Sequence, residues 1–451
     1  MRIVLYTVIY YLAINYSYSS SLNDKYVDTS LRIMAEALTD STAYNRLAFL
    51  CDKFGPRLSG SPNLENAINW ILKEMKKDSL DNVRGERVKV PVWKRGKESL
   101  KLLKPHNREL RMLGLGGSVS TPRGGIVGDL LVVDNFEDLK NNSNKVNGKI
   151  ILFNCDFTTY GETVLYRYNG AIEAAKLGAV ASLIRSIGDW SMNTPHTGNT
   201  SYHKDVKKIP HAAITMEDAG SFKRLSDRGE RITLKLDMDA KTGGDSWSRN
   251  IIAEIIGSEY PDEIIVVGGH IDSWDVGQGA HDDGGACIAS WEVLRLIKAL
   301  KLKPKRTIRC VLWTNEENGG MGSKAYRDMH LDELKNHIVA IESDGGVFAP
   351  EGFGFSGSDE AFEIVKEIHK LLKPLKAQTI TRGGRAADVA PLNDQGVPVM
   401  SLKVDNSKYF WYHHTDADTF DKVNLDEFNS CVAAMAIMAY TIADMEKPIP
   451  R

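Results

Sequence analysis

Acidic and histidine side chains follow closely after four short apolar segments in the C-terminal half of the chain. The segments are 264–267, 307–313, 338–341 and 399–404, and the polar residues near their ends are His270, Asp272, Asp282, Glu316, Glu317, Asp344, His413 and His414. Carboxylates crowded into one place repel each other, and burying them without a counter-charge is costly. A bound cation would remove both costs, so we interpret this set as a metal site.

The types of ligand in this set favour zinc or a similar ion over calcium or magnesium. Imidazole selects zinc-like ions, and the set contains no cysteine. One tetrahedral catalytic zinc needs only three protein ligands and a water. Two imidazoles and three or more carboxylates exceed that number, so the sequence predicts two ions that share a bridging carboxylate.

These residues can meet only if the apolar segments are strands of one sheet. From residue 250 onward, the segments alternate with helical patterns at 287–300, 362–372 and 425–445. This alternation predicts an α/β fold with a mixed, mostly parallel sheet and helices on both faces. Ligands of such sheets bind at the carboxyl ends of the strands, where the polar residues fall.

Residues 111–244 have a different pattern from the rest of the chain. Short apolar segments alternate there with glycine and asparagine turns, and one helical segment lies at 168–177. The block contains no cluster of acidic and histidine residues. We therefore predict a separate, noncatalytic β-rich domain, inserted into a metal-binding domain made of residues 46–110 and 245–451.

The N-terminus has the layout of a secretory signal peptide. Met1 and Arg2 precede an apolar segment at 3–14, and small residues at 17 and 19 suit cleavage after residue 19. A membrane anchor is the alternative interpretation, but the apolar segment is too short for a permanent span. No later segment approaches 18 consecutive apolar residues, so we expect no membrane contact in the mature form.

The charge balance and two sequence triplets bear on partners and localisation. The chain has 57 Lys and Arg against 59 Asp and Glu, a formal net charge of −2, which argues against nucleic acid as a partner. Asn141 and Asn199 are N-glycosylation acceptors that fit a secreted chain. We expect an extracellular protein, with lysosomal delivery or residence in the ER and Golgi during transit as the alternatives.

Together, the motifs resemble those of the co-catalytic dizinc peptidases, the family of aminopeptidases and glutamate carboxypeptidases. The resemblance rests on RLSGSP at 57–62, GGHIDSWDVGQGAHDDGG at 268–285, TNEENGGMGS at 314–323, ESDGG at 342–346 and FWYHHTDADT at 410–419. It implies a metallo-exopeptidase with two Zn²⁺ per chain, acting on short peptides with a free C-terminus. It also implies a homodimer, a propeptide or N-terminal helix at 20–45 and a protease-associated type of domain at 111–244.

The same resemblance implies a metal-binding role for five residues. It assigns one zinc to His270 and Asp344, the other to Glu317 and His414, and the bridging position to Asp282. His413 competes with His414 for one of these roles. We favour His414 because it directly precedes Thr415, as in the family motif.

Three further expectations follow from the resemblance near these ligands. Glu316 is expected to be the general acid/base that moves the proton during peptide hydrolysis. Asp272 is expected to accept a hydrogen bond from the second ring nitrogen of His270 and so fix its tautomer. The peptide bond between Asp282 and Asp283 is expected to be cis.

Segment 382–389 resembles the family segment that shapes the specificity pocket. Arg382 or Arg385 would pair with a substrate carboxylate there, because guanidinium binds carboxylate in a bidentate way. Asp388 matches an acidic position of the family segment, and Tyr412 is a further candidate for the pocket lining.

Two alternatives to a carboxypeptidase or dipeptidase remain. One is an aminopeptidase that requires a free N-terminus, and the motifs alone do not exclude it. The other is a noncatalytic, receptor-like relative of the same fold. The complete set of ligands and the acid/base Glu316 disfavour this second alternative.

Overall fold

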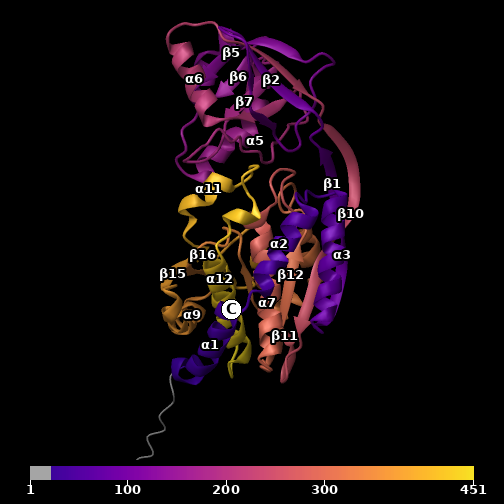
Figure 1. The fold of residues 1–451 in the computed structure, drawn as a ribbon, viewed down its shortest axis with the longest axis vertical. Helices are drawn as coiled ribbons and strands as arrows, with labels where there is room; N and C mark the ends of the chain where they lie inside the picture. The colour runs from indigo at the N-terminus through magenta and orange to yellow at the C-terminus, as the bar shows by residue number, and fades with distance from the viewer. Residues whose placement is uncertain (1–21) are drawn as a thin grey trace, which may run out of the picture.

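The computed structural model describes residues 22–451, which form two units joined by a pair of long strands (Figure 1). The predicted signal peptide at 1–19 lies outside the described residues. The first unit contains an eight-stranded sheet. In spatial order its strands are β1 (Asp81–Lys94), β10 (Lys241–Ile255), β12 (Arg306–Trp313), β11 (Tyr260–His270), β13 (His337–Glu342), β16 (Val399–Val404), β14 (Pro350–Ser356) and β15 (Thr379–Arg382).

The central strands of this sheet are parallel and buried on both faces. Ile265 and Val267 of β11 enter one apolar core, whereas Ile264 and Val266 enter the other. The central strands β12, β11, β13 and β16 pair in parallel, and so do β14 and β15 at one edge. The antiparallel pairs are β1 with β10, β10 with β12, and β14 with β16. The predicted mixed, mostly parallel sheet is thus confirmed, and its antiparallel strands lie toward the two edges.

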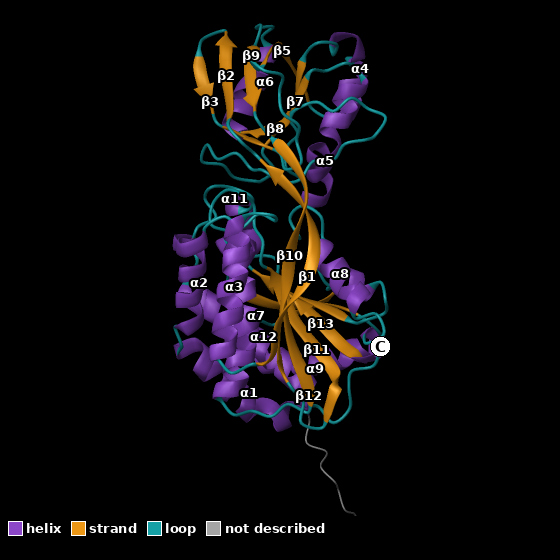
Figure 2. Ribbon diagram, turned by 90° about the vertical axis from the view of Figure 1, so that its right-hand side faces the viewer, coloured by secondary structure: helices purple, strands orange, loops and turns teal. Residues whose placement is uncertain are grey.

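Helices cover both faces of the first sheet, as predicted (Figure 2). The larger layer contains α1 (Leu22–Thr39), α2 (Thr42–Phe54), α3 (Pro62–Lys77), α7 (Gly285–Ala299), α9 (Asp359–His369) and α12 (Leu425–Asp444). The smaller layer contains α8 (Met321–Met329) and α10 (Ala390–Asn393). Within residues 22–451, no helix has the length and apolar character needed to cross a membrane.

Helix α1 falls in the segment predicted to be a propeptide or N-terminal helix. Tyr26, Ile33, Met34 and Ala37 are buried in the main core of the first unit. Their packing makes α1 an integral part of this core. Removal of the segment up to residue 45 would expose the surface that these side chains cover.

The second unit contains another eight-stranded sheet and three helices. Its strands are, in spatial order, β3 (Arg108–Leu110), β2 (Glu98–Lys104), β9 (Thr233–Met238), β5 (Ile126–Val133), β6 (Ile150–Phe153), β7 (Ala181–Arg185), β8 (His211–Ile214) and β4 (Met112–Gly114). One face packs against α4 (Phe136–Asn141) and α5 (Tyr160–Lys176), and the other against α6 (Met216–Asp227).

Two expectations about this unit need correction. Its sheet begins at Glu98, before the predicted boundary at 111, because β2 pairs with β9. The unit is also less purely β than expected, since β5 to β8 pair in parallel and α5 begins at Tyr160 rather than at 168. We call residues 98–238 the inserted unit, because they lie between β1 and β10 of the first sheet.

Candidate metal centre and active site

The predicted metal ligands gather at the carboxyl edge of the first sheet. β11, β12 and β13 are adjacent and parallel, so their carboxyl ends lie side by side. His270 ends β11, Glu316 and Glu317 follow β12, Asp344 follows β13, Asp282 lies in an irregular turn before α7, and His414 follows α11 (Tyr409–Tyr412).

These side chains form two triads that share one carboxylate. His270 Nε2 lies 3.3 Å from Oδ1 of Asp282 and 3.4 Å from Oδ1 of Asp344. His414 Nε2 lies 3.3 Å from Oδ2 of Asp282 and 3.2 Å from Oε2 of Glu317. The two oxygens of Asp282 therefore face different histidines, which is the arrangement of a bridging ligand.

The spacing of these atoms fits a shared metal ion. Ligand atoms about 2.0–2.1 Å from a tetrahedral zinc lie about 3.3 Å from each other, and the four distances within the triads are 3.2–3.4 Å. Oδ2 of Asp282 and Oε1 of Glu317 are buried without a hydrogen-bond donor. Buried carboxylate oxygens need a partner, and a cation supplies one.

His413 lies close to this centre but fits the second triad less well than Glu317. Its Nε2 is 3.9 Å from Oδ2 of Asp282, and its ring stacks on that of His414 with the centroids 3.5 Å apart. A group of three possible ligands can also be drawn from Asp282, His413 and His414. The shorter distance from His414 to Glu317 makes Glu317 the better third member.

Two further carboxylates hold the backbone of the ligands. Asp283 accepts a hydrogen bond from the backbone N–H of His270 at 3.0 Å. Asp418 accepts hydrogen bonds from the backbone N–H groups of His281 and Asp282 at 2.8 and 3.1 Å. The peptide bond between Asp282 and Asp283 is cis, as expected.

Asp272 does not hold His270 in the expected way. Nδ1 of His270 contacts the backbone carbonyl of Asp272 at 3.0 Å, whereas the nearest carboxylate oxygen is 3.9 Å away. The carboxylate accepts hydrogen bonds from the Glu316 N–H at 3.0 Å and the Ser59 hydroxyl at 3.3 Å. The backbone carbonyl therefore fixes the His270 tautomer, and the Asp272 side chain fixes the backbone of Glu316.

The carboxyl group of Glu316 lies among other acidic groups at the candidate metal centre. Burial, together with the neighbouring charges of Asp344, Asp272 and Asp282, raises the pKa of Glu316 to about 8, against an opposing effect of His270. Bound zinc ions would lower this pKa again, because nearby positive charge favours the carboxylate. Glu316 also lines a cavity beside the ligands, which is a suitable position for an acid/base group.

A cavity of about 340 Å³ opens beside the clustered ligands. The first unit supplies ligands, Glu316, Ala387 and aromatic residues of α11 to its lining, and the inserted unit supplies Tyr160, Arg167 and Tyr168. The inserted unit was predicted to be noncatalytic from its lack of acidic and histidine clusters. The structure adds to that prediction, because part of the cavity wall belongs to the inserted unit.

Arg167 is a buried cation without a carboxylate partner. Its side chain donates to the Tyr160 hydroxyl at 2.9 Å and to the Thr197 carbonyl at 3.4 Å. Nε has no hydrogen-bond partner, the residue is only 3% exposed, and no described carboxylate lies within ion-pair distance. A buried charge of this kind calls for an anionic ligand.

The structure places the predicted substrate-binding arginines outside this cavity. Arg382 is an exposed residue that pairs with Asp359, and Arg385 is an exposed residue that pairs with Asp394 at 2.6 Å. Both predictions are therefore corrected. Each side chain already has an anionic partner at the surface.

Asp388 and Tyr412 also differ from expectation. Asp388 is fully buried beside Ala387, and burial together with the Glu342 carboxylate raises its pKa well above the usual value. Tyr412 does not line the cavity and instead stacks on His281. Two other aromatic residues of α11, Tyr409 and Phe410, line the cavity instead.

The two glycosylation acceptors lie in the inserted unit with different accessibility. Asn141 ends α4 and is exposed. Asn199 is half-buried and pairs with Gly116 in an isolated bridge. The exposed Asn141 is thus the more accessible acceptor.

The roles of three residues that matter to the site are not evident from the sequence. Arg57 is fully buried and donates to the carbonyls of Ile271 and Gly279, which flank the turn before Asp282. Arg57 belongs to a recognised motif, but its role was not predictable. Arg167 and Asp418 were missed because their contacts join segments that are distant in the chain.

A family model, sequence relatives and a solved structure all relate this chain to the same peptidase family. Residues 250–439 match the model of peptidase family M28. Carboxypeptidase Q of Mus musculus is 46% identical over 409 residues, covering 91% of this chain and 87% of the relative, and that of Xenopus laevis is 47% identical over the same shares. The crystal structure of a peptidase M28 precursor from Shewanella amazonensis superposes with a TM-score of 0.91 at 34% identity, covering 95% of this chain and all of that one.

The α/β fold and the clustered ligands define a metallo-exopeptidase, a hydrolase of peptide bonds. A zinc aminopeptidase from Bacillus subtilis shares this fold, with a TM-score of 0.68 at 21% identity over 90% of this chain and 95% of that one. The chain belongs to peptidase family M28, among the carboxypeptidase Q proteins.

Proposed function

We propose that the chain is a secreted exopeptidase that uses two zinc ions to hydrolyse dipeptides and similarly short peptides with a free C-terminus. The observation that carries the proposal is the double triad, in which the two oxygens of Asp282 face His270 and His414. A single metal site would leave one of these triads without a function.

Five residues would hold the ions in this proposal. His270 and Asp344 would hold one zinc, Glu317 and His414 would hold the other, and Asp282 would contribute to both. Bound zinc would act as a Lewis acid, which lowers the pKa of water and polarises a carbonyl group. The distances within the triads and the buried, unpartnered carboxylate oxygens support this assignment.

The protein side chains then move the proton. The carboxylate of Glu316 accepts a proton from the attacking water and later donates it to the leaving amine. Asp272 holds the backbone N–H of Glu316 during both transfers. The carbonyl of Asp272 keeps the His270 ring in one orientation.

The cavity favours short substrates with a C-terminal carboxylate. Its volume of about 340 Å³ is at the low end of the range for small-molecule sites, roughly 300–1,000 Å³. Arg167 supplies an unpaired positive charge on the wall, and guanidinium binds carboxylate strongly. Arg167 therefore replaces Arg382 and Arg385 as the proposed partner of the substrate carboxylate.

An aminopeptidase is the second candidate function. Carboxylates crowd the ligand side of the cavity, and one of them could bind a free amino group. In that case Arg167 would have no role in substrate binding. The two candidates therefore differ in which end of the substrate must be free.

A substrate panel tests the proposal. The mature chain is assayed with a free dipeptide, its N-blocked form, its C-terminal amide and an aminoacyl chromophore. The proposal predicts strong cleavage of the free dipeptide and weak cleavage of the amide. Equal or faster cleavage of the amide and the chromophore would contradict it and favour the aminopeptidase.

Secretion, glycosylation and dimer formation complete the proposal. The signal-peptide layout at 1–19 supports secretion or lysosomal delivery, and the exposed Asn141 supports glycosylation. The resemblance of the sequence motifs to those of the dizinc peptidases implies a homodimer. Light scattering of the secreted protein at micromolar concentration would show twice the mass of one chain, and a monomer mass would contradict the dimer.

A further inference from the structure

The inserted unit contacts the proposed ligand His414 through the peptide group of Thr197. The backbone N–H of Thr197 donates to the carbonyl of His414 at 2.9 Å. The Thr197 carbonyl lies 3.3 Å from Nδ1 of the His414 ring, and Thr197 is only 1% exposed. His414 is thus held at its backbone and at its ring by one residue of the other unit.

The proton on the His414 ring determines what this contact does. When Nε2 faces a metal, Nδ1 carries the proton and needs an acceptor. Nη1 of Arg167 lies 3.3 Å from the same Nδ1, but a guanidinium can only donate. Nη1 donates instead to the Thr197 carbonyl, at 3.4 Å. The Thr197 carbonyl is therefore the acceptor that orients the ring.

The backbone of His414 also needs external support. Its φ of 61° lies in the left-handed region, which residues other than glycine rarely adopt. Such a conformation persists where the surrounding structure holds it. The hydrogen bond from Thr197 to the His414 carbonyl acts at this point.

Arg95 holds Thr197 in place. Arg95 directly follows β1, and its Nη2 donates to the Thr197 hydroxyl at 3.2 Å. Its Nε donates to Asp275, in the loop after β11, at 2.9 Å. The Thr197 hydroxyl donates onward to the Gly114 carbonyl at 3.0 Å. Because the Arg95 side chain is only 10% exposed, water competes little for these contacts.

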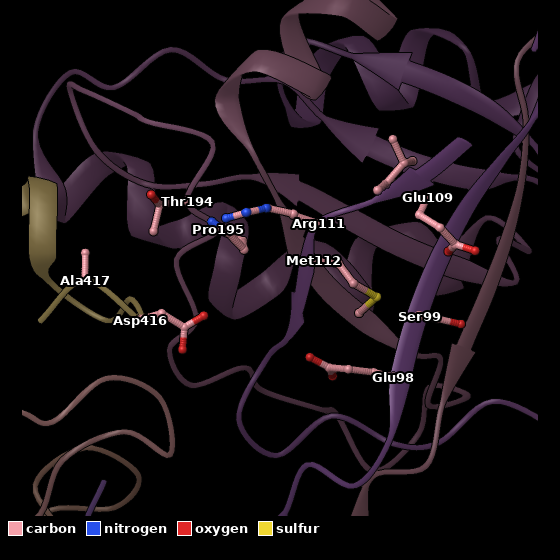
Figure 3. Close-up of a pocket in the computed structure, with 10 residues that line it drawn as sticks. Glu98, Ser99, Glu109, Arg111, Met112, Thr194, Pro195, Asp416 and Ala417 are labelled. Carbon is pink, nitrogen blue, oxygen red and sulfur yellow. The ribbon is translucent and has the colours of Figure 1, made fainter. Parts of the chain in front are cut away.

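Packing alone does not determine the geometry of this junction. A cavity of about 560 Å³ lies beside it, lined by Thr194 and Pro195 of the inserted unit and by Asp416 and Ala417 of the His414 loop (Figure 3). Glu98, 3.7 Å from Arg95, lines the same cavity. Because side chains leave this space open, polar contacts carry more of the junction.

We propose that Thr197 and Arg95 are positioning residues for the zinc ligand His414, and that the inserted unit thereby sets the affinity of one of the two metal positions. This inference rests on the proposed function, because it takes His414 as a ligand. Thr197 and Arg95 act through His414 and are absent from the lining of the cavity beside the ligands.

Zinc affinity of the full mature chain tests the inference. Thr197→Val removes the hydroxyl group that Arg95 holds, Thr197→Ser keeps it, and Arg95→Ala removes the guanidinium. Arg231→Ala is the control, because Arg231 forms an exposed ion pair with Asp129 within the inserted unit. Both Kd values for zinc are measured by competition with a chromogenic chelator, and the cobalt-substituted spectrum reports ligand geometry.

We expect T197V and R95A to raise one zinc Kd by about 10- to 100-fold, as for other residues that orient metal ligands. One cobalt band should shift, while T197S and R231A keep wild-type values. His414→Ala should weaken the same zinc position. Unchanged Kd values in T197V and R95A, or an equal loss at both zinc positions, would overturn the inference. Two unchanged Kd values in H414A would overturn the ligand assignment of the proposed function itself.

Discussion

Replacement of Arg167 by methionine separates substrate recognition from chemistry. Arg167 is 3% exposed, and Thr197 and Tyr160 already occupy two of its nitrogens. Loss of one partner from a buried charge pair costs about 2–5 kcal/mol. Because part of the guanidinium is already engaged, we expect the lower part of that range, about 2–3.5 kcal/mol, or a fall in kcat/KM of roughly 30- to 400-fold.

The assay compares a free dipeptide with its C-terminal amide. In R167M, kcat/KM should fall for the free dipeptide and change little for the amide, so that the preference between them nearly disappears. Arg385→Met is the matched control, because Arg385 is exposed and already pairs with Asp394. Zinc content is measured in both variants, since Arg167 also lies near His414. An R167M enzyme that keeps the wild-type preference would refute this account of substrate binding.

Three more perturbations test other parts of the structure. Glu316→Gln should keep its zinc and lose about 10²–10⁴-fold in kcat, whereas near-normal turnover would remove Glu316 from the acid/base role. Asp272→Ala should lower kcat by about 10- to 100-fold at unchanged zinc content, because it frees the Glu316 backbone; loss of zinc instead would mean that the carboxylate supports the metal. His330 contacts Glu86 at 3.0 Å and Glu333 at 2.7 Å, which raises the pKa of His330 and lowers the pKa of both carboxyl groups. The stabilisation that comes from protonated His330 is fully present below the pKa that His330 has in the unfolded chain. It is lost as the pH rises through the higher pKa that His330 has in the folded chain, whereas the stabilisation that comes from the two ionised carboxylates is lost in acid. Urea unfolding should therefore show His330→Gln destabilised by about 1.5–3 kcal/mol near pH 6 and by much less at pH 9, and a pH-independent difference would contradict the pairing.

The central part of the fold is predictable from the sequence because its strands are buried on both faces. Segments 264–267 and 338–341 are continuous apolar runs, and segments 307–313 and 399–404 are mostly apolar. Each of the four lies within a strand of the first sheet. β14 (Pro350–Ser356) was not predicted, because glycine at alternate positions gives it little strand character.

The boundary of the inserted unit could not be predicted from local patterns. β2 pairs with β9, and strand pairing between such distant segments leaves no mark on the composition of either strand. The first half of β10 is polar and exposed, so the long connection between the units has no apolar signal. Both features depend on tertiary contacts.

The candidate ligands were predictable because each lies near the end of an apolar strand or within a specific motif. The role of the Asp272 side chain was not predictable, because the group that contacts the His270 ring nitrogen is the backbone carbonyl of Asp272 and not its carboxylate. Arg167 looks like an ordinary helix residue within 160–176, and only the packing of the two units turns it toward the cavity. Arg382 and Arg385 had the right chemistry, but their surface partners could not be foreseen.

Anomalous diffraction at the zinc edge tests the central claim most directly. Crystals of the mature chain, grown with zinc and without chelator, are measured above and below the absorption edge. The double triad predicts two peaks of similar height, one beside each oxygen of Asp282, with His270 and Asp344 at the first and His414 and Glu317 at the second. A single peak, or two peaks that do not flank Asp282, would contradict the dinuclear site.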